Sequence, residues 1–184
     1  MRTIITLLPS RIGYLRGKAT VEIGYPWLSY GAIIALEQIV TPEFDILEFG
    51  AGGSTIFFSR RCRSVKSFES DKEWYDKVKK ALPEESNVEL NYSNIHQTLA
   101  AIKEEPLEYY DIILVDSGPH YRHRRAILDL VPPLLKVGGH LVLDNYCQKH
   151  LISFPTKGFE VYTFDDLYIK IGTRIYKKKE KKNE

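Results

Sequence analysis

The chain has 184 residues, the length of one domain, and should bury about two-thirds of its unfolded surface. With 43% hydrophobic and 27% charged residues, its composition is that of an ordinary globular protein. The formal net charge of +2 arises from the last eight residues, KKKEKKNE, whose five lysines outnumber two glutamates, so that the remaining chain sums to −1. A body this close to neutral argues against a domain built to neutralise nucleic-acid phosphates.

The two cysteines and the apolar runs indicate the compartment. Cys62 and Cys147 fit no C-x-x-C pattern, and two free thiols are typical of the reducing cytoplasm. The apolar run at residues 4–8 is too short for a signal-peptide core, and no other run approaches membrane length. The sequence thus predicts a cytoplasmic protein with no membrane partner, and it leaves the oligomeric state open.

The first element with a clear pattern is a helix that starts near Ser29, its expected N-cap, and ends at Thr41-Pro42. Its buried side should carry Ile33, Ile34, Leu36 and Val40. The segment before it, through Tyr25, shows no readable pattern.

Strand and helix patterns alternate after this helix. Strands are expected at residues 45–49, 64–69, 88–93, 110–116 and 140–145, and helices at 54–61, 71–82, 95–105 and 121–139, the last interrupted at Pro132-Pro133. The segments 159–164 and 167–176 are strands joined by Asp165-Asp166, so they should form an antiparallel hairpin.

This order predicts an α/β fold, a doubly wound, mostly parallel, Rossmann-like sheet with a C-terminal antiparallel β-hairpin. We expect a single domain over residues 1–176, with an N-terminal segment and helix at 1–43 and a Rossmann-like core at 44–176. The lysine-rich residues 177–184 should form a flexible tail.

Polar residues of chemical interest all fall where an expected strand ends. They are Glu48 and Gly50, Glu69, Ser93 and Asn94, Asp116, and Asp144 and Asn145. Ligands of doubly wound sheets bind at the carboxyl ends of the strands. The sequence therefore predicts one binding site along this rim.

The stretch EFGAGGST indicates which ligand the site binds. Gly50 and Gly52 are followed by Thr55 where the dinucleotide fingerprint has its third glycine, and no phosphate-binding P-loop pattern is present. Glu48 would repel a pyrophosphate and suits a cationic ligand such as S-adenosylmethionine, although it could also be a capping or solvated carboxylate. Glu69 is placed to accept hydrogen bonds from ribose hydroxyls, in S-adenosylmethionine or in NAD.

With these motifs the chain resembles the class I S-adenosylmethionine-dependent methyltransferases. ILEFGAGGST is similar to their first motif, SFESDKEWYDKVKKAL to the ribose- and adenine-binding segment, and LLKVGGHLVLDN to the passage into their fifth strand. The resemblance implies a methyltransferase domain and S-adenosylmethionine as cofactor. It implies these cofactor-binding residues: Glu48, Gly50, Gly52, Gly53, Ser54, Glu69, Ser70, Ser93, Asn94, Ile95 and Asp116.

The ends of the fourth and fifth strands are expected to carry the chemistry. Asp116, Asp144 and Asn145 are similar to the metal-binding set of the catechol and caffeoyl-CoA O-methyltransferases, which would hold Mg²⁺ or another divalent cation. Those enzymes carry a lysine where this chain has Pro119, so His120 becomes the candidate base. The alternative is that both acids contact acceptor or water directly. The predicted catalytic residues are Asp116, His120 and Asp144.

The acceptor is less specified. His120, Arg122, His123, Arg124 and Arg125 could hold an anionic acceptor, or several could form a solvated helix face. Tyr25, Trp27 and Tyr30 could stack on a ligand or pack at the sheet edge.

The leading prediction is O-methylation of a small-molecule or glycan hydroxyl. The alternatives are an RNA methyltransferase, disfavoured by the near-neutral body, an NAD-dependent oxidoreductase, and a non-catalytic nucleotide-binding protein.

Overall fold

The structure is a computed structural model that describes residues 19–118, 121–148, 151, 153–165 and 172–180. Its strands are β1 Asp45–Phe49, β2 Ser64–Glu69, β3 Val88–Tyr92, β4 Tyr110–Val115, β5 Leu135–Asp144, β6 Phe159–Phe164 and β7 Thr173–Lys178. Its helices are α2 Thr20–Ile23, α3 Tyr30–Ile39, α4 Gly53–Ser59, α5 Lys72–Ala81, α6 Ile95–Glu104, α7 Tyr121–Leu128 and the short 3₁₀ helix η1 Pro132–Leu134.

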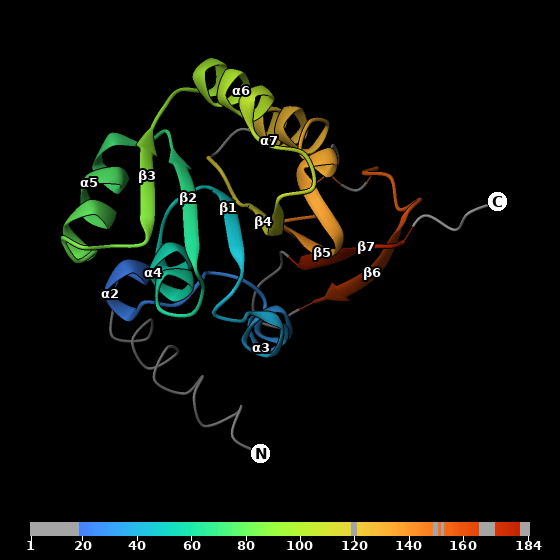
Figure 1. Cartoon of the computed structure of the whole chain (residues 1–184), viewed down its shortest axis with the longest axis horizontal. Coiled ribbons are helices and arrows are strands. Elements are labelled where there is room, and N and C mark those ends of the chain that lie inside the picture. The colour runs from blue at the N-terminus through green and yellow to red at the C-terminus, as the bar shows by residue number, and fades with distance from the viewer. Residues whose placement is uncertain (1–18, 119–120, 149–150, 152, 166–171, 181–184) are drawn as a thin grey trace.

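The seven strands form one sheet in the order β3-β2-β1-β4-β5-β7-β6 (Figure 1). Strands β1 to β5 are parallel, and β7 is antiparallel to both β5 and β6. The expected Rossmann-like fold with an antiparallel end is confirmed. The strand order reverses between β1 and β4, which places a crevice at their carboxyl ends.

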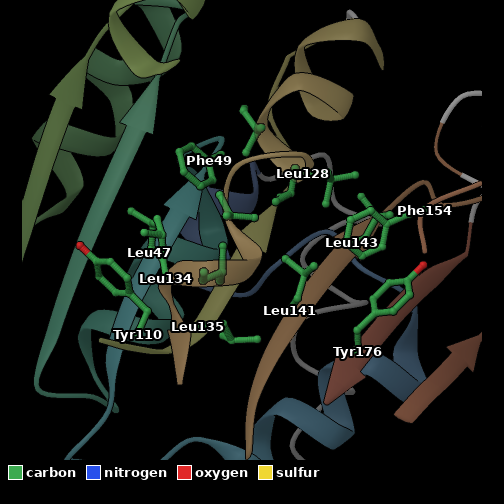
Figure 2. Packing of buried hydrophobic residues seen from close by; sticks show 14 of the residues in the cluster. Leu47, Phe49, Tyr110, Leu128, Leu134, Leu135, Leu141, Leu143, Phe154 and Tyr176 are labelled. Atoms are coloured by element: carbon green, nitrogen blue, oxygen red, sulfur yellow. The ribbon is translucent and has the colours of Figure 1, made fainter. Parts of the chain in front are cut away.

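Each face of the sheet carries its own hydrophobic core, because side chains alternate along each strand. On β1, Leu47 and Phe49 join the cluster under α6 and α7, whereas Ile46 joins the cluster under α3 and α4. Figure 2 shows the first cluster, in which Tyr176 of β7 packs near Phe154. Helices on both faces therefore hold the strand ends in fixed positions.

The structure differs from the sequence prediction after α7. The helix expected over residues 121–139 ends at Leu128, and residues 135–139 belong to β5. Pro132 and Pro133 lack backbone N–H groups and form the start of η1 instead. The extra residues are accommodated by an irregularity, since Tyr110 pairs with Leu135 and Ile112 with His140.

Smaller differences occur at both ends of the chain. Helix α2 has no counterpart among the expected elements, and the buried side of α3 consists of Ala32, Ile33 and Leu36, while Ile34 and Val40 are only partly buried. The Ser29 hydroxyl does not cap α3 but accepts a hydrogen bond from the Thr173 N–H at 3.1 Å.

The closing hairpin is confirmed, with β7 displaced from the expected strand. It starts at Thr173 and runs to Lys178, so two residues of the expected tail lie in the sheet. Half of the expected strand 167–176, residues 167–171, and its connection at Asp166 lie outside the described residues. In the part of the chain that the structure describes, no helix has the length and apolarity needed to cross a bilayer.

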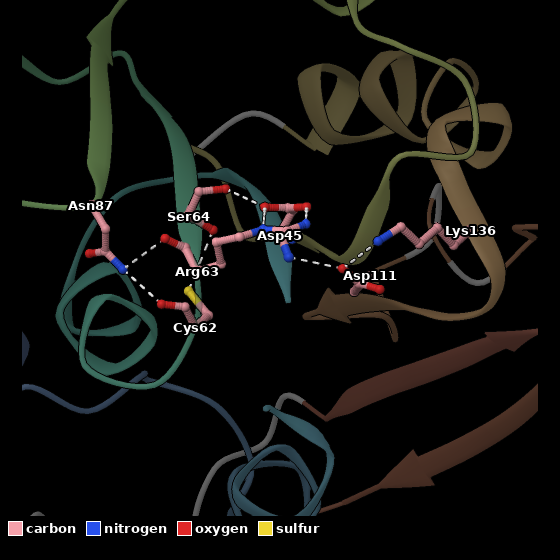
Figure 3. A network of polar contacts seen from close by, with 7 residues as sticks. All are labelled: Asp45, Cys62, Arg63, Ser64, Asn87, Asp111 and Lys136. Atoms are coloured by element: carbon pink, nitrogen blue, oxygen red, sulfur yellow. Dashed lines mark hydrogen bonds and ion pairs between the residues drawn. The ribbon is translucent and has the colours of Figure 1, made fainter. Parts of the chain in front are cut away.

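A polar network joins the amino ends of the strands, opposite the predicted site (Figure 3). The buried Asp45 carboxylate accepts hydrogen bonds from the Arg63 guanidinium and from the Ser64 hydroxyl. Asp111 Oδ2 accepts from the Asp45 N–H at 2.9 Å and from Lys136 Nζ at 2.8 Å. The network therefore ties together the starts of β1, β2, β4 and β5.

Candidate active site

Two adjoining cavities lie at the carboxyl ends of β1 to β4. The inner cavity, of about 200 Å³, is lined by Phe49, Phe68, Glu69, Ser70, Ser93, Asn94, Ile95, Thr98, Ser117, Gly118, His123 and Ile127. The outer cavity, of about 380 Å³, is lined by Thr20, Trp27, Gly50, Ala51, Gly52, Gly53, Ser54, Glu69, Asp71, Trp74, Asp116 and Gly118. Because Glu69 and Gly118 border both, the two cavities form one elongated site.

The glycine loop between β1 and α4 forms the floor of the outer cavity. Gly50 has a φ of +97°, and a Cβ added there would lie 2.6 Å from the Asp116 backbone oxygen. Thr55, which replaces the third glycine of the dinucleotide fingerprint, accepts a hydrogen bond from the Gly52 N–H at 2.8 Å. The loop is therefore held from behind by a side chain.

Glu48 lies beneath this loop and lines neither cavity. The side chain is fully buried, and Oε2 accepts hydrogen bonds of 2.6 Å from the Thr55 and Ser67 hydroxyls. Oε1 has no hydrogen-bond partner among the described residues. Burial raises the pKa of Glu48 to about 7, against the lowering effect of the surrounding hydroxyls. In this structure the Glu48 carboxylate therefore supports the loop through Thr55.

Glu69 lies at the centre of the site. Its Oε1 accepts hydrogen bonds from the N–H groups of Ser70 and Asp71, both at 2.7 Å, and Oε2 accepts one from Ala51 at 3.0 Å. Burial raises the pKa of Glu69, whereas these N–H groups lower it. Oε1 already accepts two hydrogen bonds, whereas Oε2 accepts one and has a second lone pair, so the fixed carboxylate can accept a hydrogen bond from a diol between the two cavities.

Besides Glu69, the inner cavity is lined by four of the predicted cofactor residues, Ser70, Ser93, Asn94 and Ile95. The Asn94 side chain caps α6 by accepting the Gln97 N–H at 3.1 Å, which fixes the loop after β3. Phe49 and Phe68 stack behind it with ring centroids 5.6 Å apart. An apolar wall with a few polar groups suits a heteroaromatic ring.

The sequence analysis missed the contribution of α2 and its surroundings. Thr20 and Trp27 line the outer cavity together with Trp74 of α5, whose indole N–H donates to the Ala51 oxygen. The only sequence pattern that pointed to this region was the aromatic cluster around residue 27. One member of that cluster, Tyr25, lines neither cavity, and its hydroxyl donates a hydrogen bond to Glu37. Helix α2 is too short to show a periodicity.

Gly53 makes the closest backbone contact in this region, and Gly53→Ala should be poorly tolerated. A Cβ there would lie 2.0 Å from the Tyr25 oxygen and 2.6 Å from the Thr20 oxygen, so α2 would have to move. We expect a loss of about 2 kcal/mol in the free energy of unfolding, measured by urea denaturation. Gly52→Ala is the control, because its Cβ would meet nothing nearer than Trp74 at 3.3 Å. Equal losses in both variants would contradict this account.

The carboxyl ends of β4 and β5 carry the predicted acids. Asp116 is part-exposed at the outer cavity, and its Oδ1 accepts a hydrogen bond from Arg124 Nη2 at 2.9 Å. The buried Asp144 accepts from Thr173 Oγ1 at 2.9 Å and from Asn145 Nδ2 at 2.6 Å. Burial and the neighbouring Asp144 raise the pKa of Asp116 well above 3.8, and burial raises that of Asp144 to about 6.

The oxygen atoms of Asp116, Asp144 and Asn145 do not fit a divalent cation as its ligands. Both oxygens of Asp144 and one of Asp116 already accept hydrogen bonds, and a guanidinium already balances part of their charge. The amide oxygen of Asn145 is buried and has no hydrogen-bond partner among the described residues, but it would supply a metal ion with only one uncharged ligand atom. Among the described residues no group of three His, Cys, Asp or Glu side chains is arranged to hold a metal ion.

The basic cluster of α7 is divided between different contacts. Arg124 is buried against Asp116, Arg125 pairs with Asp129 at 2.9 Å, and His123 lines the inner cavity. Arg122 is exposed. The predicted base His120 lies outside the described residues, as does Pro119. Two of the three arginines are thus engaged with protein carboxylates, which weakens the case for an anionic acceptor.

A comparison of sequences identifies the family to which this site belongs. The sequence model of a family described as a methyltransferase domain matches residues 47–146, more than half of the chain. The chain belongs to this family. It is a class I S-adenosylmethionine-dependent methyltransferase, as the resemblance of its motifs implied. The matched range extends from the glycine loop to the residues after β5. No protein with a curated description matches the chain by sequence.

Solved methyltransferase structures share the fold. A protein from Staphylococcus aureus described as a candidate caffeoyl-CoA O-methyltransferase is 15% identical, with a TM-score of 0.66 and coverage of 94% of this chain and 91% of that one. A tRNA (m1A58) methyltransferase from Aquifex aeolicus is 17% identical, with a TM-score of 0.63 and coverage of 88% and 75%. A candidate methyltransferase from Streptococcus mutans, solved with S-adenosylhomocysteine, is 20% identical, with a TM-score of 0.60 and coverage of 78% and 93%.

Proposed function

We propose that this methyltransferase transfers the methyl group of S-adenosylmethionine to a hydroxyl oxygen of a small molecule or glycan. The observation that carries the proposal is Asp116, which lines the outer cavity beside the glycine loop and has the buried Asp144 as its neighbour at the end of β5. An oxygen acceptor must lose a proton as it is methylated, and a carboxylate of raised pKa is suited to receive that proton.

The two cavities support a placement of the cofactor along the rim of the sheet. Glu69 would bind the ribose hydroxyls, and the inner cavity with Ser93, Asn94 and Ile95 would enclose the adenine. The methionine part would then extend along the glycine loop towards Asp116. When bound, S-adenosylmethionine supplies the activated methyl group and leaves as S-adenosylhomocysteine.

The protein residues provide alignment and one proton transfer. Asp116 would orient the acceptor hydroxyl and take its proton as the new carbon–oxygen bond forms. Asp144 would assist by sharing the charge of the pair, and Trp27 and Trp74 would shield the reacting atoms from water. The sequence also predicts His120 as a base, and that residue lies outside the described residues.

Thermal unfolding with S-adenosylhomocysteine tests the cofactor part. A ligand at one hundred times its dissociation constant adds about 2.7 kcal/mol to the free energy of unfolding, a shift of about 5–10 °C at this size. We expect that shift with S-adenosylhomocysteine and none with NAD. A shift with NAD alone would contradict the assignment.

The acceptor class needs a separate assay. Radiolabelled methyl transfer into a cell extract, followed by fractionation with and without ribonuclease, separates small acceptors from RNA. We propose that the label enters a ribonuclease-resistant, low-molecular-weight fraction of a cytoplasmic extract. Label that becomes soluble only after ribonuclease would favour the RNA methyltransferase alternative, which the tRNA enzyme among the structural relatives keeps open.

A further inference from the structure

Arg124 is a buried cation between the ends of β4 and β5. It comes from α7 and is only 7% exposed. All three of its guanidinium nitrogens donate hydrogen bonds: Nε to the Ser117 oxygen at 2.8 Å, Nη1 to the Asp144 backbone oxygen at 2.9 Å, and Nη2 to the Asp116 backbone oxygen and Oδ1 at 3.2 and 2.9 Å. One side chain thus binds the backbone of both strand ends and one catalytic carboxylate.

The position of this guanidinium is the one that the sequence assigned to a divalent cation. A cation there has to hold the ends of two strands in register and balance the charge of Asp116 and Asp144. Arg124 does both with donors in a rigid planar arrangement. A divalent ion at the same carboxylates would sit beside the guanidinium, and the repulsion between two buried cations would oppose its binding.

We propose that Arg124 is the resident cation of the Asp116–Asp144 pair and that the site functions without a divalent metal. The inference rests on the proposed function, since it takes the pair as the site of methyl transfer. Arg124 acts on the reaction through Asp116, so it is a positioning residue. Because the guanidinium is part of the chain, chelators cannot remove it.

Metal binding to the unmodified protein is the first test. Mn²⁺ is titrated into the protein with and without Asp116→Asn, and the free ion is followed by electron paramagnetic resonance. We expect the same weak, nonspecific binding in both proteins. Stoichiometric binding of Mn²⁺ that is lost in Asp116→Asn would overturn the proposal.

The second test separates charge from packing at position 124. Removing one partner of a largely buried ion pair is strongly destabilising, so Arg124→Met should lower the melting temperature by about 10 °C. Arg124→Lys keeps the charge and should recover part of that loss, although it lacks the planar fork. Arg125→Met is the matched control on the exposed side of the same helix, where its pair with Asp129 contributes little.

Two outcomes of this comparison would count against the proposal. A lysine variant no more stable than the methionine variant would mean that Arg124 acts by packing alone. Equal losses in Arg124→Met and Arg125→Met would mean that the buried contacts add nothing. If Arg124→Met does not fold, Arg124→Lys and the Mn²⁺ titration still decide. S-adenosylhomocysteine binding is measured on the same samples, and its absence in the unmodified protein would refute the proposed function instead.

Discussion

Replacing Glu69 with alanine is expected to weaken S-adenosylhomocysteine binding by about 100-fold or more. A hydrogen bond from a ribose hydroxyl to a carboxylate contributes about 1.5–3 kcal/mol. The variant also leaves the N–H groups of Ala51, Ser70 and Asp71 without their acceptor, so the loop between the two cavities loses its fixed shape. Isothermal titration calorimetry measures the effect directly.

Glu73→Ala is the control for this variant. Glu73 is exposed in the first turn of α5 and pairs with Lys77 at 2.7 Å, so its removal changes the local charge by the same amount without touching either cavity. Equal affinities of the Glu69 and Glu73 variants would show that the ribose binds elsewhere.

Asp116→Asn is expected to reduce turnover by about 100- to 10,000-fold while leaving S-adenosylhomocysteine affinity within a few-fold. The amide keeps the shape of the side chain but cannot take the proton from the hydroxyl group that is methylated. Asp111→Asn is the control at the other end of β4, where it should cost stability through the loss of its pair with Lys136 and leave turnover unchanged. Turnover that survives Asp116→Asn would refute the assignment of the base.

The same pair gives turnover and stability opposite dependences on pH. Turnover requires a deprotonated carboxylate, so it should rise with pH through the raised pKa values of the pair. Stability should move the other way, because the folded pKa of Asp144, about 6, exceeds the ordinary value of 3.8. The folded state then binds more protons, and this contribution to stability is present below about pH 4 and lost as the pH rises towards 6. In Asp116→Asn the repulsion between the acids is gone, so chemical denaturation across this range should show a smaller slope.

The order of the elements could be predicted from the sequence because each has a local cause. The glycine loop, the buried strands and the polar residues at their ends all follow from short-range patterns, and Glu69 lines both cavities at the rim where the sequence predicts a binding site. Asp116 and Asp144 were likewise expected at neighbouring strand ends, which the pairing of β4 with β5 confirms.

The partners within the site could not be predicted in the same way. Glu48 reads as a ligand-facing residue because it precedes the glycines, but alternation along β1 turns it towards Ser67 and Thr55. Arg124 reads as one of several basic residues on a helix, and its contact with Asp116 depends on how α7 packs against the sheet. The partner of Glu48 on β2 and the partner of Arg124 after β4 depend on tertiary packing, which no local pattern encodes.

The network at the amino ends of the strands has a consequence for how this enzyme could diversify. This network anchors four strands at their amino ends, opposite the candidate active site, through Asp45, Arg63, Asp111 and Lys136 (Figure 3). Substitutions on the exposed surface around the cavities, at Trp27 or on the outer face of α7, therefore leave these contacts intact. A scaffold of this kind lets acceptor preference drift under mutation while the chain stays folded, so closely similar folds can come to serve different acceptors.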